Sequence, residues 1–236
     1  MAANDPTEAA LLTLDAVSKS FDGIEAVAGI SFTVATGAVI AVVGAGYTGK
    51  TTLLDLISGV LKPDQGSIRF NGHDLASLAP HQIAALGISR CFNPPRPFEA
   101  LSAEDNVIVG ALLHERSTAA ARRLALSLLD RLGLTGLRHL PASHLTMTQR
   151  KCLELARALA TRPRLLLLDE MLAETSSEEW TSLTEILTND AQANGTALLF
   201  AEPDLHAIGT LTDRIITLDQ GTLGGETPQD TAGPEA

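Results

Sequence analysis

The strongest signal along the chain is a set of short segments that are apolar at almost every position. Ala38–Val43 reads AVIAVV, and Arg164–Leu168 is apolar after its first residue. Ala197–Ala201 and Arg214–Leu218 are further largely apolar runs of strand length. A strand without alternation is typical of a parallel sheet that is covered on both faces. We therefore expect an α/β fold with a mainly parallel sheet.

Other segments have the spacing of half-buried strands or of helices. Leu11–Lys19 and Ile30–Ala35 alternate between apolar and polar residues, which predicts strands with one buried face. From Ser102 to about Leu134 the spacing is helical, and Ser102 with Asp105 has the pattern of a helix N-cap followed by an acidic first turn. Further helices are expected at Lys50–Ser58, Pro80–Leu86, Thr148–Thr161 and Glu178–Asp190, and further strands at Ser67–Phe70 and Ile88–Phe92.

The composition limits the size of the fold and the choice of partners. A chain of 236 residues, 45% of them hydrophobic, is long enough for one large domain with a sizeable core. The formal net charge of −11 opposes binding to a phosphate backbone, so we expect no nucleic-acid partner. Cys91 and Cys152 lie in apolar contexts without metal-ligand spacing, as reduced thiols in a cytoplasmic protein do. No apolar run approaches the ~20 residues of a membrane span, and residues 1–10 lack the features of a targeting segment.

A glycine-rich motif follows the first apolar strand. Gly44–Thr51 reads GAGYTGKT and matches G-x-x-x-x-G-K-[ST] between an expected strand and an expected helix. Glycines allow backbone N–H groups to curl around phosphates, and the helix that begins at Lys50 directs its positive end at the same anion. Lys50 adds a full charge, and the hydroxyl of Thr51 is suited to Mg²⁺. The alternative is a chance glycine turn, which the flanking strand and helix argue against. The loop alone does not distinguish kinases, GTPases and transport ATPases, and the expectation of ATP and Mg²⁺ rests on the further motifs and the resemblance below.

A second motif delivers two carboxylates to one edge of the expected sheet. Leu165–Leu168 leads directly into Asp169 and Glu170, and ligands bind at the carboxyl ends of parallel strands in such sheets. We expect Asp169 to hold Mg²⁺ through water and Glu170 to act on the attacking water as the catalytic residue. The alternative is a strand that simply ends in a charged turn. Beside a phosphate loop, the carboxylate pair favours hydrolysis of ATP.

The two motifs and the segment between them resemble the ATP-binding subunits of ABC transporters, over about Leu11–Asp230. Between the motifs, Leu145–Gln149 (LTMTQ) and the helix after it resemble the ABC signature region. The stretches GHDLASLAPHQIAALGISRCF and DRIITLDQGTLGGETPQD are similar to the branch that imports branched-chain amino acids. The resemblance implies a P-loop NTPase core, an N-terminal antiparallel β subdomain and an inserted α-helical subdomain at about residues 94–148. It places the ATP-binding domain at residues 11–230, with residues 1–10 and 231–236 as disordered ends.

The resemblance also implies partners, a location and further site residues. ABC ATP-binding subunits pair as homodimers or heterodimers and dock on transmembrane permease subunits. We therefore expect the chain in the cytoplasm, peripheral on the inner face of the cell membrane. Phe21 falls where the family has an aromatic residue that stacks on adenine, unless it is an ordinary residue at a strand end, and Asn93 falls at the Q-loop, as a further candidate for Mg²⁺. The expected ATP-binding residues are Phe21, Gly44, Ala45, Gly46, Tyr47, Thr48, Gly49, Lys50, Thr51, Thr52, Asn93 and Asp169, with Thr51 and Asp169 as ligands of Mg²⁺.

Several positions depart from the family pattern. Asn93 stands where the Q-loop has Gln, and Met147 and Thr148 replace the two glycines of the signature. The D-loop position reads Glu174–Ser176 instead of G-L-[DN]. Pro203 stands where the family has the switch histidine, and proline has neither a polar side chain nor an N–H with which to contact phosphate. These departures weaken the expectation of fast ATP hydrolysis.

Two classes of function follow from these residues. The first is a working ATPase that drives amino acid import, with the phosphate loop and the carboxylate pair carrying the chemistry. The second is a catalytically impaired ATP-binding pseudoenzyme that acts as a structural or regulatory partner in a heterodimer, because each composite site would contain one of the departures. A third hypothesis, a soluble ABC factor in translation or DNA repair, is disfavoured because such factors resemble tandem or longer chains.

Overall fold

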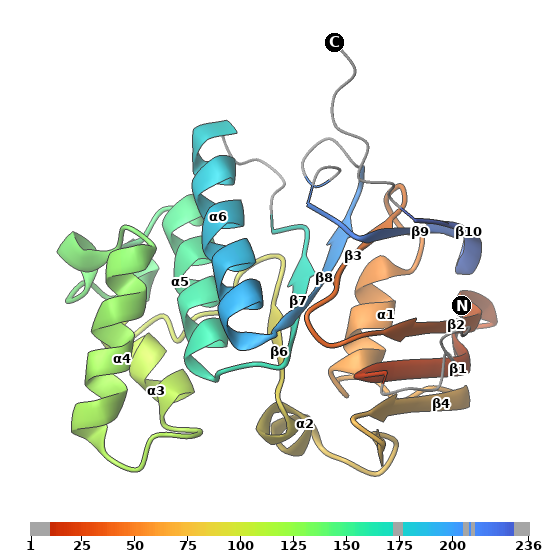
Figure 1. Ribbon diagram of the computed structural model, residues 1–236, viewed down its shortest axis with the longest axis horizontal. Coiled ribbons are helices and arrows are strands. Elements are labelled where there is room, and N and C mark those ends of the chain that lie inside the picture. Colours follow the sequence, from red (N-terminus) through yellow and green to blue (C-terminus); the bar gives the residue numbers. More distant parts are fainter. Residues whose placement is uncertain (1–9, 172–176, 205–207, 209–210, 229–236) are drawn as a thin grey trace, which may run out of the picture.

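The computed structural model describes residues 10–171, 177–204, 208 and 211–228. It contains an antiparallel sheet, a mainly parallel sheet and helices on both faces of the latter (Figure 1). The antiparallel sheet confirms the expected N-terminal β subdomain. Its four strands lie in the order β2-β1-β4-β5, with the bounds β1 Leu12–Phe21, β2 Ile24–Val34, β4 Gln65–Phe70 and β5 His73–Asp74.

The second sheet has six strands in the order β10-β9-β3-β8-β7-β6 and lies at the centre of the molecule. β3 pairs in parallel with β8 and β9, and β7 pairs in parallel with β6 and β8. Only the edge strand β10, among the described strands of this sheet, runs antiparallel to its neighbour. The expectation of a mainly parallel sheet is therefore confirmed. The bounds are β3 Val39–Val43, β6 Ile88–Cys91, β7 Leu165–Asp169, β8 Ala197–Glu202, β9 Arg214–Asp219 and β10 Thr222–Pro228.

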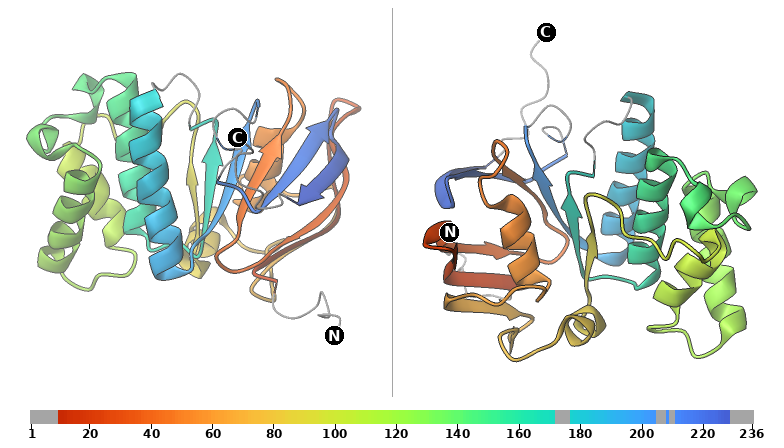
Figure 2. Two further views of the ribbon diagram at one scale, coloured as in Figure 1. Left: turned by 45° about the horizontal axis from the view of Figure 1, so that its top comes forward. Right: turned by 180° about the vertical axis from the view of Figure 1, so that it is seen from behind.

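The helices cover both faces of the central sheet and form a group at one end. α1 (Lys50–Ile57) lies on the face toward the antiparallel sheet, and α5 (Met147–Ala160) and α6 (Ser177–Asn194) lie on the other face (Figures 1 and 2). α3 (Ala103–Ala111) and α4 (Thr118–Arg131) pack with α5 at the end of the molecule that is far from the antiparallel sheet. This group corresponds to the expected helical insert. The remaining helical segments are α2 Pro80–Leu86 and the 3₁₀ turns η1 Thr135–Leu137 and η2 Ala142–His144.

The leucine run of β7 explains how the central sheet is held between its two covers. All side chains of Leu165–Leu168 are fully buried, and alternate residues enter two different hydrophobic clusters. One cluster includes Leu53 and Leu54 of α1, and the other includes Leu153 and Leu155 of α5. Each fully buried leucine contributes about 1.5–3 kcal/mol to the folded state. The strand that ends in Asp169 is thus fixed from both sides.

The predicted helical stretch of residues 102–134 is divided in the structure. Ser102 caps α3 as expected, because its Oγ accepts a hydrogen bond from the backbone N–H of Asp105 at 3.0 Å. A second cap lies inside the stretch, where the Oγ of Ser117 accepts from the N–H of Ala120 at 3.2 Å and α4 begins. The helical spacing of this stretch is confirmed for α3 and α4, and the break between them was not predicted because this second cap was not recognised.

Two further expectations concern cysteines and the membrane. Both cysteines were expected to be buried, which is confirmed for Cys91 in β6 but not for Cys152 in α5, which is half-buried, and neither forms a disulfide bond within the described residues. Within the part of the chain that the structure describes, no helix has both the length and the apolar character that crossing a membrane requires.

Candidate nucleotide-binding site

The glycine-rich motif forms a tight loop between the end of β3 and the start of α1. Gly49 has φ +99°, and a Cβ at this position would lie 2.0 Å from the carbonyl oxygen of Ala26. At Gly44, a Cβ would lie 2.3 Å from the carbonyl oxygen of Leu218. Both distances are far below a normal contact, so the path of the loop requires glycine at these two positions. The neighbouring strands β2 and β9 therefore leave no room for a side chain at these two positions of the loop.

The side chain of Lys50 is folded back into this loop and is only 4% exposed. Its Nζ donates hydrogen bonds to the carbonyl oxygens of Gly44 at 2.6 Å and Ala45 at 2.9 Å. The same Nζ lies 3.9 Å from Oε1 of Glu170, across the loop. The loop thus encloses a buried cation that faces a carboxylate.

A cavity of about 640 Å³ opens over the loop. This volume is in the range of binding sites for small molecules and cofactors. The lining combines loop backbone, a lysine and hydroxyl groups, which are the groups that bind phosphate. The described lining consists of Ala26, Gly46, Tyr47, Thr48, Gly49, Lys50, Thr51, Thr52 and Glu170.

Asp169 lies at the end of β7, directly against the first turn of α1. The hydroxyl of Thr51 donates to Oδ1 of Asp169 at 3.2 Å. Asp169 is 2% exposed, and this burial raises the pKa of its carboxyl above the ordinary value, although hydrogen bonds from Arg90 and Thr51 act in the opposite direction. The two motifs are therefore joined through Thr51 and Asp169, the two residues that the sequence suggests as ligands of Mg²⁺.

The oxygen atoms of Thr51 and Asp169 fit Mg²⁺. A hydroxyl and a carboxylate are hard oxygen ligands, and Mg²⁺ is usually bound by one or two carboxylates together with substrate phosphates. The described residues contain no cluster of three or more His, Cys, Asp or Glu side chains that could hold a metal ion. The donor set therefore suits a metal that completes its coordination on phosphate and water.

Glu170 is positioned by the two strands on either side of β7. Its backbone, with φ +42°, donates its N–H to the carbonyl oxygen of Ala201 at 2.9 Å. Its Oε2 accepts a hydrogen bond at 3.0 Å from Nδ2 of Asn93, which follows β6. The shorter amide at the Q-loop position therefore reaches the carboxylate that was expected to act on water.

Arg90 is a residue of this site that the sequence reasoning missed. It lies in β6, and its Nη2 donates to Oδ2 of Asp169 at 2.8 Å. The signal was present as a single charged residue within the strand predicted at Ile88–Phe92. A buried charge needs a partner of opposite charge, so this arginine could have been assigned to the carboxylates of the neighbouring strand.

The comparisons with known proteins agree with this geometry. A family model described as "ABC transporter" matches residues 27–173. The chain belongs to the ABC transporter family. Within that family it is an ATP-binding subunit, as the phosphate loop and the carboxylate pair indicate.

The curated relatives and the solved structures refine this membership. The chain is 28% identical to the high-affinity branched-chain amino acid transport ATP-binding protein BraF of Pseudomonas aeruginosa, and 29% identical to the corresponding protein LivG of Escherichia coli. Each match covers 93% of this chain and 92% of the relative. An ATP-binding cassette of an ABC transporter, solved in its ADP conformation, has a TM-score of 0.82 at 25% identity, covering 94% of this chain and 92% of that one. A dimeric cassette bound to ADP and Pi has a TM-score of 0.86 at 21% identity, covering 92% of this chain and 98% of that one, and supports the fold alone. These relatives are named as transport proteins, which gives no support to the pseudoenzyme alternative.

Phe21, at the family's adenine-stacking position, lies at the end of β1. Its side chain is 43% exposed, and Nζ of Lys19 lies 5.7 Å from the centre of its ring. Phe21 is not part of the described lining of the cavity, to which the same subdomain contributes Ala26. Contact of Phe21 with adenine therefore stays a prediction.

The signature region of the family corresponds to the start of α5. The hydroxyl of Thr146 accepts from the N–H of Gln149 at 3.3 Å, and the side chain of Gln149 accepts from the N–H of Thr146 at 3.0 Å. This capping box satisfies two of the N–H groups at the helix start. The side chain of Met147 is 51% exposed, so it projects where the family has a glycine.

The other two departures lie beside β7 or beyond the described residues. Pro203 follows β8 directly and is exposed, while Glu202 before it is buried. Since β8 pairs with β7, Pro203 leaves the sheet next to the strand that carries Glu170. The D-loop position at Glu174–Ser176 lies outside the described residues.

Proposed function

We propose that the chain is the ATP-binding subunit of an importer of branched-chain amino acids, and that it couples binding and hydrolysis of ATP to transport. The observation that carries the proposal is Lys50, buried in the phosphate loop and facing Glu170, with Thr51 and Asp169 in contact beside it. The substrate class is supported by relatives that match 93% of the chain and are named as branched-chain amino acid transport ATP-binding proteins.

The phosphates of ATP bind against the loop and the start of α1. In the structure, Nζ of Lys50 donates hydrogen bonds to the carbonyl oxygens of Gly44 and Ala45. When ATP binds, Nζ donates to phosphate oxygens instead. Hydrogen bonds between a charged donor and phosphate are roughly twice as strong as neutral ones. The N–H groups at the start of α1 add positive potential at the same place.

Thr51 and Asp169 would hold Mg²⁺ beside the phosphates, with Asp169 acting through water. The bound metal would supply positive charge to neutralise the charge that develops on the phosphoryl oxygens. Asn93 contacts Glu170 in the structure, so its amide serves the carboxylate.

Glu170 orients the attacking water and accepts its proton. The water oxygen bonds to the terminal phosphorus while the bond from that phosphorus to the oxygen of ADP breaks, and the proton of the water passes to the carboxylate. Asn93 binds Oε2 of Glu170, and Oε1 faces Lys50 at 3.9 Å. Oε1, on the side of the phosphate loop, is therefore the atom that receives the proton.

A second ATP-binding subunit and the permease complete the transporter. In the family, the signature region of one subunit faces the phosphates that the other subunit holds, and one fold relative was solved as a dimer with ADP and Pi. In this chain the start of α5 at Thr146 would take that position. We place the chain in the cytoplasm at the inner face of the membrane, docked on permease subunits.

Uptake of labelled amino acids tests the proposal. In cells that lack the gene for this chain, uptake of leucine, isoleucine and valine should fall, while uptake of ribose should not change. Expression of the wild type should restore amino acid uptake, Glu170→Gln should not, and the exposed-site control Arg123→Ala should act like the wild type. Unchanged amino acid uptake in the deletion, or full rescue by Glu170→Gln, would contradict the proposed coupling.

A further inference from the structure

Arg90 is a charged side chain in the interior of the protein. It belongs to β6, opposite Leu167 of β7 in the parallel register, and its side chain is only 4% exposed. Removing a guanidinium from water costs several kcal/mol unless good ionic and hydrogen-bond partners replace the water. The residues that contact Arg90 therefore indicate its role.

The guanidinium connects α1 with the end of β7. Nη1 donates to Oδ1 of Asp55 at 2.5 Å and lies 3.4 Å from Oγ of Ser58, while Nη2 donates to Oδ2 of Asp169 at 2.8 Å. Two nitrogens of one planar group thus bind two carboxylates at once. A lysine ammonium has neither the planar shape nor the fixed separation of donors that this arrangement requires.

The position of the guanidinium is itself restrained by aromatic packing. Its Cζ lies 4.7 Å from the centre of the Phe92 ring, and the guanidinium of Arg96 lies 4.9 Å from the same ring. A guanidinium this close to an aromatic ring is attracted to it. The Phe92 ring is therefore a further partner of Arg90, in addition to the two carboxylates.

The contact with Arg90 determines which oxygen of Asp169 faces the metal site. Oδ2 accepts from Arg90, whereas Oδ1 accepts from Thr51, the hydroxyl that is expected to bind Mg²⁺. We propose that Arg90 is a positioning residue for Mg²⁺: by holding Oδ2, it keeps Oδ1 of Asp169 beside Thr51, where the hydrated metal is bound. This inference rests on the proposed function.

The same segment also serves the second carboxylate of the site. Asn93, three residues after Arg90, donates to Oε2 of Glu170. The run from β6 into the Q-loop therefore contacts both the metal-binding and the catalytic carboxylate. Arg90 orients the first, and Asn93 orients the second.

Measuring ATP affinity at increasing Mg²⁺ concentrations distinguishes two roles of Arg90. In one, Arg90 positions Asp169 for Mg²⁺, and in the other it only links α1 to the sheet. ATP affinity is measured by calorimetry in EDTA and at increasing free Mg²⁺, for the wild type, Arg90→Gln, Arg90→Lys and the matched control Asp55→Asn. Mutation of a residue that holds a metal ligand typically changes metal affinity about 10–100-fold. The Mg²⁺ concentration that gives half of the increase in ATP affinity should therefore be about 10–100-fold higher for Arg90→Gln than for the wild type. Its ATP affinity in EDTA should stay that of the wild type. Asp55→Asn removes the negative charge of the partner on α1 and leaves the contact between Arg90 and Asp169, so it should lower the melting temperature and leave the Mg²⁺ dependence unchanged.

The possible outcomes either support the inference or overturn it. If a folded Arg90→Gln variant has the Mg²⁺ dependence of the wild type, Arg90 only cross-links α1 to the sheet and the inference is wrong. If Arg90→Gln does not fold, Arg90→Lys decides: a smaller shift in the same direction supports the inference, and a wild-type response overturns it. Absence of any Mg²⁺ effect in the wild type would overturn the metal site and the inference together. Failure of amino acid uptake with an intact Mg²⁺ effect would contradict only the transport proposal.

Discussion

We expect Pro203 to be the residue that most limits the proposed hydrolysis of ATP. It leaves β8 next to the strand that carries Glu170, and it can donate no hydrogen bond to phosphate. A missing donor to developing charge typically costs about 10²–10³ in rate. We predict that Pro203→His raises steady-state ATP hydrolysis by up to that factor, as measured by phosphate release from the chain alone and with its partner.

The signature departures provide the comparison for Pro203. Met147 projects at the start of α5, but the helix start and the hydroxyl of Thr146 remain in place. The double variant Met147→Gly and Thr148→Gly should therefore gain less than Pro203→His. If ATP hydrolysis is faster in the glycine variant and unchanged in Pro203→His, the departures in the signature limit the rate more than Pro203 does.

The positions of the glycines in the phosphate loop differ in whether they have room for a side chain. Gly49→Ala would place a Cβ 2.0 Å from the carbonyl of Ala26 at a positive φ, a conformation that costs other residues about 1–2 kcal/mol even without the clash. We expect a lower melting temperature and loss of ATP binding, as measured by thermal unfolding and calorimetry. Gly46→Ala is the control for the melting temperature only, because its Cβ would meet no heavy atom of the described chain within 4 Å beyond its sequence neighbours. Equal behaviour of the two variants would show that the loop has another shape.

For individual residues, the sequence predicted the motifs that are continuous along the chain, but not the contacts between residues that are far apart in the sequence. The phosphate loop and the pair Asp169 and Glu170 could be predicted because each is a short run at the end of an apolar strand. The spacing of residues gave no sign of the link from Arg90 to Asp55 on α1, whereas a lone charge within an apolar strand was the available signal for its pairing with Asp169.

Among the elements, burial decided which strands could be predicted. The strands β3, β7 and β8 of the central sheet are apolar over most of their length, because both faces are covered. The edge strand β10 was missed, because Thr222–Pro228 contains two glycines and is extended through its pairing with β9. The close approach of α3 and α5 was equally hidden, since it depends on Gly110, whose Cβ would lie 2.5 Å from the carbonyl of Arg157.

The reactivity of the two cysteines depends on how β6 and α5 are packed. Burial raises the pKa of the Cys91 thiol well above its ordinary value, and the charge of Glu154 adds to this effect. Cys152 is half-buried and lines a cavity of about 390 Å³ between α4, α5 and α6. We predict that a thiol reagent at neutral pH modifies Cys152 in the native protein and Cys91 only after unfolding, because the thiolate and its access control the reaction.

Peptide mapping by mass spectrometry before and after addition of denaturant measures both sites in one sample. The variant Cys152→Ser is the control, and it should bind almost no reagent in the native state. Rapid native modification of Cys91 would contradict the packing of β6 against the helices.

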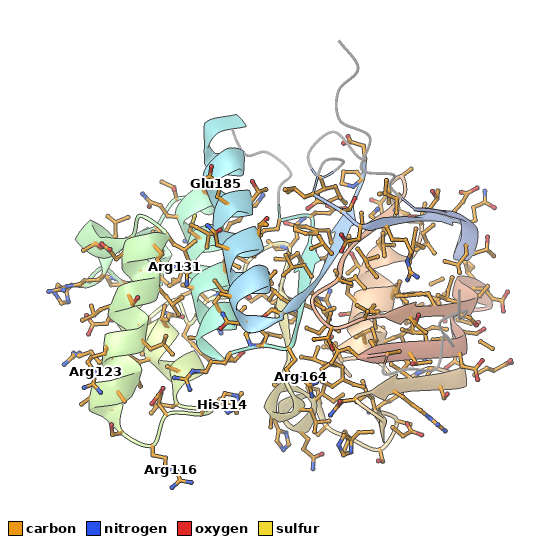
Figure 3. The ribbon with its side chains drawn as sticks, viewed as in Figure 1. His114, Arg116, Arg123, Arg131, Arg164 and Glu185 are labelled. Atoms are coloured by element: carbon orange, nitrogen blue, oxygen red, sulfur yellow. The ribbon has the colours of Figure 1, made fainter. Side chains whose placement is uncertain are left out.

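For the whole molecule, the charge distribution bears on how it reaches a membrane. The net charge of −11 opposes binding to anionic lipid, although Arg116 and Arg123 extend from the helical end into solvent (Figure 3). We predict that the chain sediments with membranes only in cells that also contain the permease subunits. The measurement is fractionation with and without the permease genes, with the double variant Arg116→Ala and Arg123→Ala as the control for lipid attraction. Tight association without the permease, lost in this double variant, would contradict docking on a protein partner.

Equilibrium binding of ATP tests the central claim most directly, because every later step requires it. Lys50 is the buried cation of the phosphate loop, and hydrogen bonds to charged groups contribute about 1.5–3 kcal/mol. Calorimetry with Mg²⁺ should show ATP binding to the wild type and roughly 10- to 100-fold weaker binding to Lys50→Ala. The exposed-site control Arg123→Ala should bind ATP like the wild type. Absence of ATP binding to the wild type, or equal affinity in Lys50→Ala, would contradict the account.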